Sequence, residues 1–269
     1  MSDSDGLSSE SNNDQNATRP IMTGSPTGIR RADRNGLELI DAMAGRASVF
    51  AFGYEPIVEA IQAMAESYLG DASAFVDQPP SCDDSLPSKL LDLLSESTAI
   101  AADSISVHSS ADMAVETAIG LARKYRPEKS FRTIALVGSD HGRSGMCRTA
   151  SGRPELQAGY GPMMAGFAHV PVGEVDAIRA TIDELTACIL RSPVDLLCGA
   201  RPIEAEYLTG VRELCDQNEI LLIIDETQVV FGASGQPFAF SAIANVRADV
   251  AVLASGLFGG LAGGMVIAS

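Results

Sequence analysis

Four short polar segments follow apolar runs that we predict to be strands, and they hold most of the residues that could do chemistry. These segments are His108–Ser110, Ser139–His141, Asp225–Gln228 and Ser255. Their carboxylates, imidazoles and hydroxyls are the groups that proteins use for proton transfer, nucleophilic attack and ligand binding. Because ligands bind at the carboxyl ends of strands in open parallel sheets, we expect these segments to share one rim.

A serine hydrolase is the simplest chemistry that a serine and a histidine suggest. The candidates are Ser255 or Ser144 with His141, but the chain contains no Gly-x-Ser-x-Gly elbow, and Ser144 lies only three residues beyond His141. That spacing does not suit a nucleophile and its base. We therefore do not favour a hydrolase.

Strands and helices alternate along the chain, which is typical of parallel strands joined by crossover helices. We predict strands at Ser104–His108, Thr133–Val137, Phe167–Val170, Val194–Cys198 and Ile220–Ile224, and on either side of Ser255. We predict helices at Pro56–Tyr68, Leu86–Ser95, Ala111–Tyr125, Glu174–Leu190 and Tyr207–Asn218, after a short alternating segment at Gly36–Asp41. The expected fold is an α/β sheet, mostly parallel, with helices on both faces.

Composition excludes some classes of partner. The chain has 269 residues, 46% hydrophobic content and a formal net charge of −16, so it is long enough for an enzyme and repels nucleic acids and anionic membranes. Five cysteines occur singly, without metal-ligand spacing, and indicate reduced thiols in a cytoplasmic protein. No metal is expected. The lysines are Lys89, Lys124 and Lys129.

The two ends of the chain differ in character. Residues 1–27 are polar and predict a flexible arm, with no basic and apolar signal peptide at the start. We expect an N-terminal segment at 28–100 and the main domain at 101–269. The apolar stretch Val250–Ser269 is about long enough to cross a bilayer, but its glycines weaken a helix. We favour two buried strands there and keep a membrane tail anchor as the alternative.

A set of short motifs, in a specific order, resembles the class III pyridoxal-phosphate aminotransferases of the ornithine and acetylornithine type. The motifs are Gly36–Asp41, Gly53–Pro56, Val58–Ile61, Ala114–Ala118, Leu121–Arg123, His141–Arg143, Gly159–Pro162, Gly166–Phe167, Arg212–Asp216, Asp225–Gln228 and Phe231–Gly232. The resemblance runs from Gly36 to the end of the chain. It implies the large domain of the fold-type I transferases, with a C-terminal small domain missing.

The resemblance also implies which residues would contact pyridoxal 5'-phosphate. Asp225 would pair with the pyridinium nitrogen and Gln228 with the phenolic oxygen of the ring. His141 lies where the family has a histidine after its aromatic residue. Without the resemblance, the alternative for Asp225 is a helix cap or turn residue after a strand, and a lone histidine such as His141 is more often a turn or packing residue than a catalytic one.

Four departures from the family pattern fall on this same site. Ser110, Ala111 and Asp112 stand where backbone amides hold the phosphate, and a carboxylate there repels an anion. Asp140 replaces the aromatic residue that stacks on the ring. The segment 198–202 replaces a Glu-Pro and glycine-rich loop. Ser255 stands at the lysine that forms the Schiff base, and a hydroxyl cannot form one.

These departures predict an aminotransferase-like protein that is catalytically inactive and binds pyridoxal phosphate weakly or not at all. The alternatives are a functional transaminase acting on ornithine-like or acetylornithine-like amino donors, and a non-enzymatic partner-binding paralogue. Family resemblance further implies a homodimer, or a heterodimer with a related aminotransferase.

Overall fold

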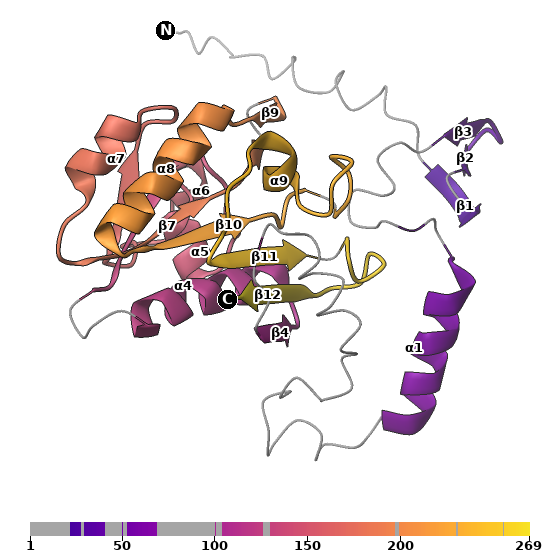
Figure 1. Ribbon diagram of the computed structural model, residues 1–269. Coiled ribbons are helices and arrows are strands. Elements are labelled where there is room, and N and C mark those ends of the chain that lie inside the picture. The colour runs from indigo at the N-terminus through magenta and orange to yellow at the C-terminus, as the bar shows by residue number, and fades with distance from the viewer. Residues whose placement is uncertain are drawn as a thin grey trace, which may run out of the picture.

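A seven-stranded sheet with the strand order β4-β12-β11-β10-β7-β5-β6 forms the centre of the protein (Figure 1). The computed structural model describes residues 22–27, 30–40, 50, 53–68, 100, 104–125, 130–196, 199–229, 231–254 and 256–269. The strands of the sheet are β4 (Ser104–His108), β5 (Arg132–Leu136), β6 (Phe167–Val170), β7 (Thr186–Arg191), β10 (Leu221–Asp225), β11 (Val250–Ala254) and β12 (Gly264–Ala268).

Strand direction places the ends of most strands at one edge. Strands β11, β10, β7, β5 and β6 pair in parallel, while β12 pairs antiparallel with both β11 and β4. All six residues of β7 are buried, as are the last four of β10, and the residues between the polar ends Thr186, Arg191 and Asp225 are apolar. Their carboxyl ends point to the right-hand side of Figure 1.

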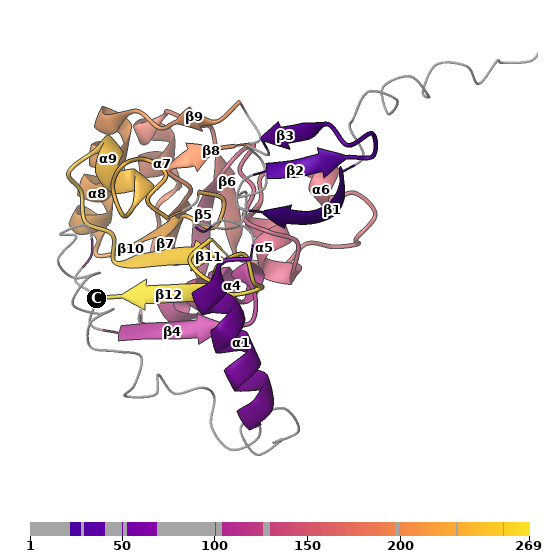
Figure 2. The same ribbon diagram turned by 90° about the vertical axis from the view of Figure 1, so that its right-hand side faces the viewer.

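Helices cover both faces of the sheet. One face carries α4 (Ala111–Tyr125) and α5 (Gly145–Ala150), followed by the short α6 (Pro154–Gln157). The other carries α7 (Val175–Thr181), α8 (Ala205–Asn218) and α9 (Ala239–Ile243) (Figures 1 and 2). Each face therefore has its own apolar cluster. Burying one Leu or Ile side chain in such a cluster stabilises the fold by roughly 1.5–3 kcal/mol.

Alternation along the central strands decides which side chains reach which cluster. On β7, Leu190 packs with α4 and Ile189 packs on the α8 face. On β10, Ile223 packs with α4 and Ile224 on the α8 face. Because successive side chains of a strand point to opposite faces, the next residue of β7 faces α8, whereas the last residue of β10 faces α4.

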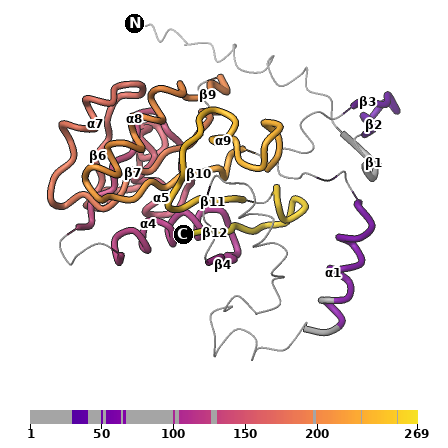
Figure 3. Tube along the Cα trace, viewed as in Figure 1, coloured from indigo at the N-terminus to yellow at the C-terminus, as the bar shows by residue number. Residues whose placement is uncertain are grey.

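The N-terminal elements lie to one side of the large sheet (Figure 3). Strands β1 (Met22–Thr27), β2 (Arg30–Asp33) and β3 (Glu38–Ile40) form an antiparallel sheet, and α1 (Glu55–Tyr68) follows. The prediction of a flexible arm to residue 27 therefore fails at Met22–Thr27, where backbone pairing with β2 gives the segment a strand structure. Residues 1–21 of the predicted arm lie outside the described residues.

One predicted helix is wrong in its second half. The sequence predicts a helix over Glu174–Leu190, but α7 ends at Thr181 and residues 186–191 form the central strand β7. Asp183 marks the break, because its Oδ1 accepts hydrogen bonds from the Leu185 N–H at 3.1 Å and from the Thr186 hydroxyl at 3.0 Å. A short run buried on both faces has no period that distinguishes strand from helix.

The formation of strand β7 also affects the segment that follows it. Among the described residues of the predicted strand Val194–Cys198, Val194–Asp195 form β8, which pairs with β9 (Arg201–Pro202) instead of entering the large sheet. Residues 197–198 lie outside the described residues. Thr186–Arg191 already fills the central place, between β10 and β5. The predicted helix Leu86–Ser95 falls outside the described residues.

The other predicted strands and helices that fall on described residues agree with the structure. The segments β4, α4 and β6 have the predicted bounds, and β5, β10, α1 and α8 differ by one or two residues at one or both ends. Strands β11 and β12 pair antiparallel, as the buried-strand reading of the C-terminal stretch predicts. Among the described helices, none combines the length and the apolar character needed to cross a membrane. Cys147, Cys188 and Cys215 are buried free thiols.

Candidate functional site

A pocket of about 320 Å³ opens where the chain leaves β5, β8 and β10. We call it the strand-end pocket. Its lining consists of Asp112, Asp140, His141, Gly142, Arg143, Leu196, Thr227 and Gln228. Four of the predicted cofactor-binding residues are in this set: Asp112, Asp140, His141 and Gln228. The structure therefore brings together segments that lie more than a hundred residues apart in sequence.

A buried pair of His141 and Asp225 forms the base of the site. The Nδ1 atom of His141 lies 2.6 Å from Oδ2 of Asp225, and both side chains are 0% exposed. The other carboxylate oxygen of Asp225 accepts a hydrogen bond from the Thr227 N–H at 2.9 Å. His141 lines the pocket whereas Asp225 does not. The imidazole thus lies between Asp225 and the open volume, and its Nε2 atom is buried without a hydrogen-bond partner.

Backbone contacts fix the position of this histidine. The His141 N–H donates to the Ser151 hydroxyl oxygen at 2.8 Å, and that hydroxyl donates to the Cys147 carbonyl at 2.8 Å. The Ser192 hydroxyl donates to the carbonyl of Asp225 at 3.0 Å. The pair is therefore held from β7, β10 and α5 together.

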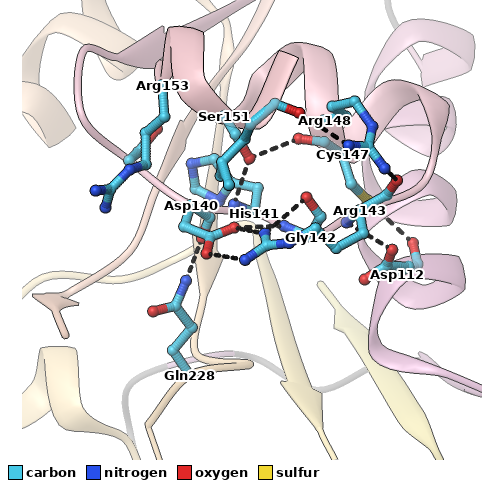
Figure 4. Close-up of polar contacts among 12 residues, drawn as sticks. Asp112, Asp140, His141, Gly142, Arg143, Cys147, Arg148, Ser151, Arg153 and Gln228 are labelled. Atoms are coloured by element: carbon cyan, nitrogen blue, oxygen red, sulfur yellow. Dashed lines mark hydrogen bonds and ion pairs between the residues drawn. The ribbon is translucent and has the colours of Figure 1, made fainter. Parts of the chain in front are cut away.

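An ion pair of Asp140 and Arg143 forms the wall of the pocket (Figure 4). The guanidinium donates from Nη1 to Oδ1 at 2.5 Å and from Nη2 to Oδ2 at 2.9 Å. Burial alone would raise the pKa of Asp140, but the hydrogen bonds from Arg143 and from the Gly142 N–H outweigh burial and hold the pKa below its usual value. The Gln228 amide also donates to the backbone carbonyl of Asp140.

Two acidic residues of α4 bind the loop that follows Asp140. Oδ2 of Asp112 accepts hydrogen bonds from the N–H groups of Arg143 at 2.8 Å and Ser144 at 2.7 Å. Oε1 of Glu116 accepts from the Ser144 hydroxyl at 2.6 Å and from the Met146 N–H at 3.0 Å. These carboxylates satisfy N–H groups at the start of α5, where a negative charge is favourable.

Gly142 permits this contact. Its φ is +122°, and a Cβ atom there would lie 2.4 Å from Oδ1 of Asp112. The backbone conformation and the space both require glycine. Close packing also positions the start of α4, because a Cβ atom at Gly264 of β12 would lie 2.5 Å from the Ser110 carbonyl.

The other predicted site residues have different surroundings. The Ser110 hydroxyl accepts a hydrogen bond from the Met113 N–H at 3.2 Å and caps α4, of which Ala111 is the first residue. Ser255 lies outside the described residues, as do Cys198, Lys89 and Lys129. Lys124 is exposed near the far end of α4. With a rise of 1.5 Å per residue, that end is about 18 Å from Asp112.

The roles of Arg143, Glu116 and Glu226 are not predicted from the sequence. Arg143 follows the carboxylate of Asp140 by three residues, and Glu116 follows Asp112 by four on the same helix, so opposite charge and helical spacing were available signals. Glu226 is almost fully buried, and burial raises its pKa to about 7. No local sequence pattern reveals that its Oε1 atom accepts a hydrogen bond from the Phe240 N–H at 2.9 Å.

Chemically, the strand-end pocket presents two carboxylates, one guanidinium, an imidazole and an amide. Its charged groups are directed largely at one another and at backbone N–H groups. No Lys, Phe, Tyr or Trp side chain occurs among the residues that line it. The described lining can accept and donate hydrogen bonds, but it contains no amine nucleophile.

Comparison with known proteins identifies the family pattern over most of the chain. The family model described as aminotransferase class-III matches residues 11–269. The acetylornithine aminotransferase of Methanopyrus kandleri is 34% identical over 250 residues, which are 93% of this chain and 62% of that protein. That of Agrobacterium fabrum is 33% identical over 259 residues, which are 94% of this chain and 62% of that protein. The chain thus spans about three fifths of these curated relatives.

Solved structures share the fold. The ornithine aminotransferase from Toxoplasma gondii has a TM-score of 0.76 at 22% identity, with 94% of this chain and 59% of that chain covered. A transaminase from the marine bacterium Virgibacillus has a TM-score of 0.76 at 24% identity, with 97% and 62% covered. These similarities confirm the predicted α/β transferase fold.

Proposed function

Because this chain belongs to the class III aminotransferase family, we propose that it is an aminotransferase-like protein that keeps the large-domain fold but does not catalyse transamination. The observation that best supports this proposal is in the wall of the strand-end pocket, where the Asp140 carboxylate forms an ion pair with Arg143. In the family an aromatic residue at this position would cover the cofactor ring.

Family membership implies pyridoxal phosphate as the cofactor, an aldehyde that supplies an electron sink when it is held by a lysine. The described residues fit it at one end only. Asp225 and Gln228 have the chemistry to bind a protonated ring nitrogen and a phenolic oxygen. However, the Asp225 carboxylate is already bonded to His141 and to the Thr227 N–H.

The other end of the site suits the cofactor poorly. Asp112 places a carboxylate in the pocket at the start of α4, where a phosphate would be held. Although two N–H groups stabilise this carboxylate, its negative charge still opposes a bound phosphate. Lys124 is too distant to reach the pocket, and we propose that Ser255 occupies the position of the Schiff-base lysine.

A cofactor titration tests the proposal. Pyridoxal phosphate added to the intact chain should give no imine absorbance band and no adduct after borohydride reduction, as judged by mass spectrometry. Ser255→Lys alone should gain little, because Asp112 and Asp140 remain. Ser234→Lys, at an exposed position, is the matched control for nonspecific imines. A stoichiometric adduct at a single lysine of the unaltered chain would overturn the proposal.

The relatives favour one alternative, a working transaminase for ornithine-like or acetylornithine-like amino donors. Both curated relatives described above are named acetylornithine aminotransferases. If the chain is inactive, incubation with acetylornithine, an α-keto acid and pyridoxal phosphate should give no amino-acid product. Product formation that Asp225→Asn abolishes would establish the alternative instead.

We also propose that the chain works as a homodimer or with a related aminotransferase. Support comes from α1, where the apolar side chains of Val58 and Ile61 are 39% and 42% exposed. Tyr54, just before this helix, is 45% exposed. Such a surface favours coverage by another subunit. Light scattering should show a dimer that Ile61→Asp dissociates, while Gln62→Asp, on an exposed position of the same helix, leaves it intact. A monomeric chain would refute self-association, and co-expression with a related aminotransferase would then test the mixed pair.

A further inference from the structure

A second pocket, of about 300 Å³, lies near the carboxyl ends of β5, β6 and β7. We call it the α8-side pocket. Apolar side chains of Val137, Val172 and Ile203 form part of its wall, and Arg191 and Tyr207 contribute polar groups. No residue that lines it also lines the strand-end pocket.

The sheet separates the polar groups of the two pockets. Arg191 is the last residue of β7 and pairs with Ile224, whose side chain packs on the α8 face. Asp225, the next residue of β10, therefore points to the opposite face, toward α4. The segment after β7 also divides the two volumes, because Asp195 lines the α8-side pocket and Leu196 lines the strand-end pocket.

Two buried polar atoms in this pocket have no hydrogen-bond partner. Arg191 is 3% exposed, and its Nε atom makes no hydrogen bond. Tyr207 is 6% exposed, and its hydroxyl makes none either. Burial lowers the pKa of Arg191, and Tyr207 and Asp195 partly offset this effect. A buried guanidinium N–H and a buried hydroxyl without hydrogen-bond partners are costly, so their retention beside an open volume indicates a ligand that completes them.

The lining specifies the charge and shape of that ligand. A guanidinium and a phenolic hydroxyl both donate hydrogen bonds, which a carboxylate accepts. Arg201, Asp195 and Glu204 also line the pocket. The two carboxylates offset the second guanidinium and disfavour a second negative charge, while the apolar wall suits a hydrocarbon body. We propose that the α8-side pocket binds a small organic monocarboxylate, with its carboxylate on Arg191 and Tyr207. This proposal does not depend on whether the strand-end pocket binds pyridoxal phosphate.

Calorimetric titration of the intact chain with hexanoate, hexan-1-ol, hexylamine and inorganic phosphate tests the assignment. Hexanoate should bind saturably, and the other three compounds should bind at least several-fold more weakly. Arg191→Met should weaken hexanoate binding by about tenfold or more, and Tyr207→Phe by about threefold to tenfold. Arg179→Met is the matched control, since its guanidinium is exposed on α7 and pairs with Asp176 at 3.6 Å.

Thermal unfolding without ligand separates loss of the site from loss of the fold. Arg191→Met should unfold at a temperature equal to or higher than that of the unaltered chain, because it removes a buried charge whose Nε atom has no hydrogen-bond partner. Hexanoate should raise the unfolding temperature of the unaltered chain and of Arg179→Met, but not that of Arg191→Met. The proposal is overturned if hexanoate fails to bind, if Arg191→Met binds it equally well, or if hexan-1-ol or phosphate binds as tightly.

Discussion

The strand-end pocket and the α8-side pocket lie at the same edge of one sheet but treat their charges in opposite ways. In the first, Asp225, Asp140 and Asp112 each have a partner within the protein. In the second, Arg191 and Tyr207 keep donors without partners. The comparison indicates that the carboxylates of the first site are satisfied within the protein, where, among the described residues, only the buried Nε2 atom of His141 keeps no partner, whereas the donors of the second site are completed by a ligand. Substitutions in the first site should therefore destabilise the folded protein, whereas substitution of Arg191 in the second site should not.

Breaking the buried histidine pair should have the largest effect. His141→Ala leaves the Asp225 carboxylate, which is 0% exposed, with only the Thr227 N–H as a partner. We expect the free energy of unfolding in urea at pH 7 to fall by about 3–5 kcal/mol. The double variant His141→Ala with Asp225→Ala is the control, and it should recover part of the loss. A loss below about 1 kcal/mol would mean that the pair is not the structural unit inferred here.

Glu226 extends the comparison to the residue after Asp225. Its Oε1 accepts the Phe240 N–H, but Oε2 is buried without a partner, and burial raises the pKa to about 7. The folded state then holds a proton that the unfolded state releases near its ordinary pKa of 4.5. Stability should thus fall as pH rises from about 4.5 to 7 and stay level above that range.

Glu226→Gln should remove this pH dependence. Gln keeps an oxygen acceptor for the Phe240 N–H and carries no charge, so the variant should be more stable at pH 8 by up to about 3 kcal/mol. Urea unfolding across pH 4 to pH 8 measures the difference. Equal pH profiles for the variant and the unaltered chain would show that Glu226 is not one of the groups that the fold leaves incompletely paired.

How far sequence predicts this molecule depends on the range of the interactions involved. Helix α4 and strand β4 follow from local pattern, because Ser110 caps the helix and apolar residues recur at helical spacing. Strand β7 does not, because its burial on both faces is set by β10 and β5, which are distant in sequence. The rim hypothesis brings Asp140, His141 and Gln228 together correctly, since strand polarity alone requires it.

The charge pairing could not be read from the sequence. Asp112 was interpreted as a charge that repels a phosphate, yet its carboxylate oxygen binds two N–H groups of a loop some thirty residues away. Arg191 carries no local signal, because its burial depends on α8 packing over the end of β7. Both roles arise from tertiary packing.

Removing the Asp112 cap should have an intermediate effect and shows whether this carboxylate is structural. Asp112→Ala leaves the N–H groups of Arg143 and Ser144 without their acceptor, so we expect a loss of about 1–2 kcal/mol in the free energy of unfolding. Asp112→Asn keeps one oxygen acceptor and should lose less. Asp176→Ala is the matched control, because that side chain is 98% exposed in the first turn of α7. A loss no larger than the control's would leave phosphate repulsion as the better account of Asp112.

The ion pair of Asp140 and Arg143 should contribute least, although it defines the pocket wall. Arg143 is 53% exposed, so solvent screens the attraction, and Asp140→Asn should lose only about 0.5–1 kcal/mol at pH 7. The lowered folded-state pKa of Asp140 fixes the sign of the pH dependence. The contribution is present above the unfolded pKa of about 3.9 and disappears as pH falls through the folded value. Paired urea titrations of the variant and the unaltered chain should therefore converge at low pH and diverge above about pH 4. A gap that widens on acidification would show that the pair does not hold the carboxylate in its charged form.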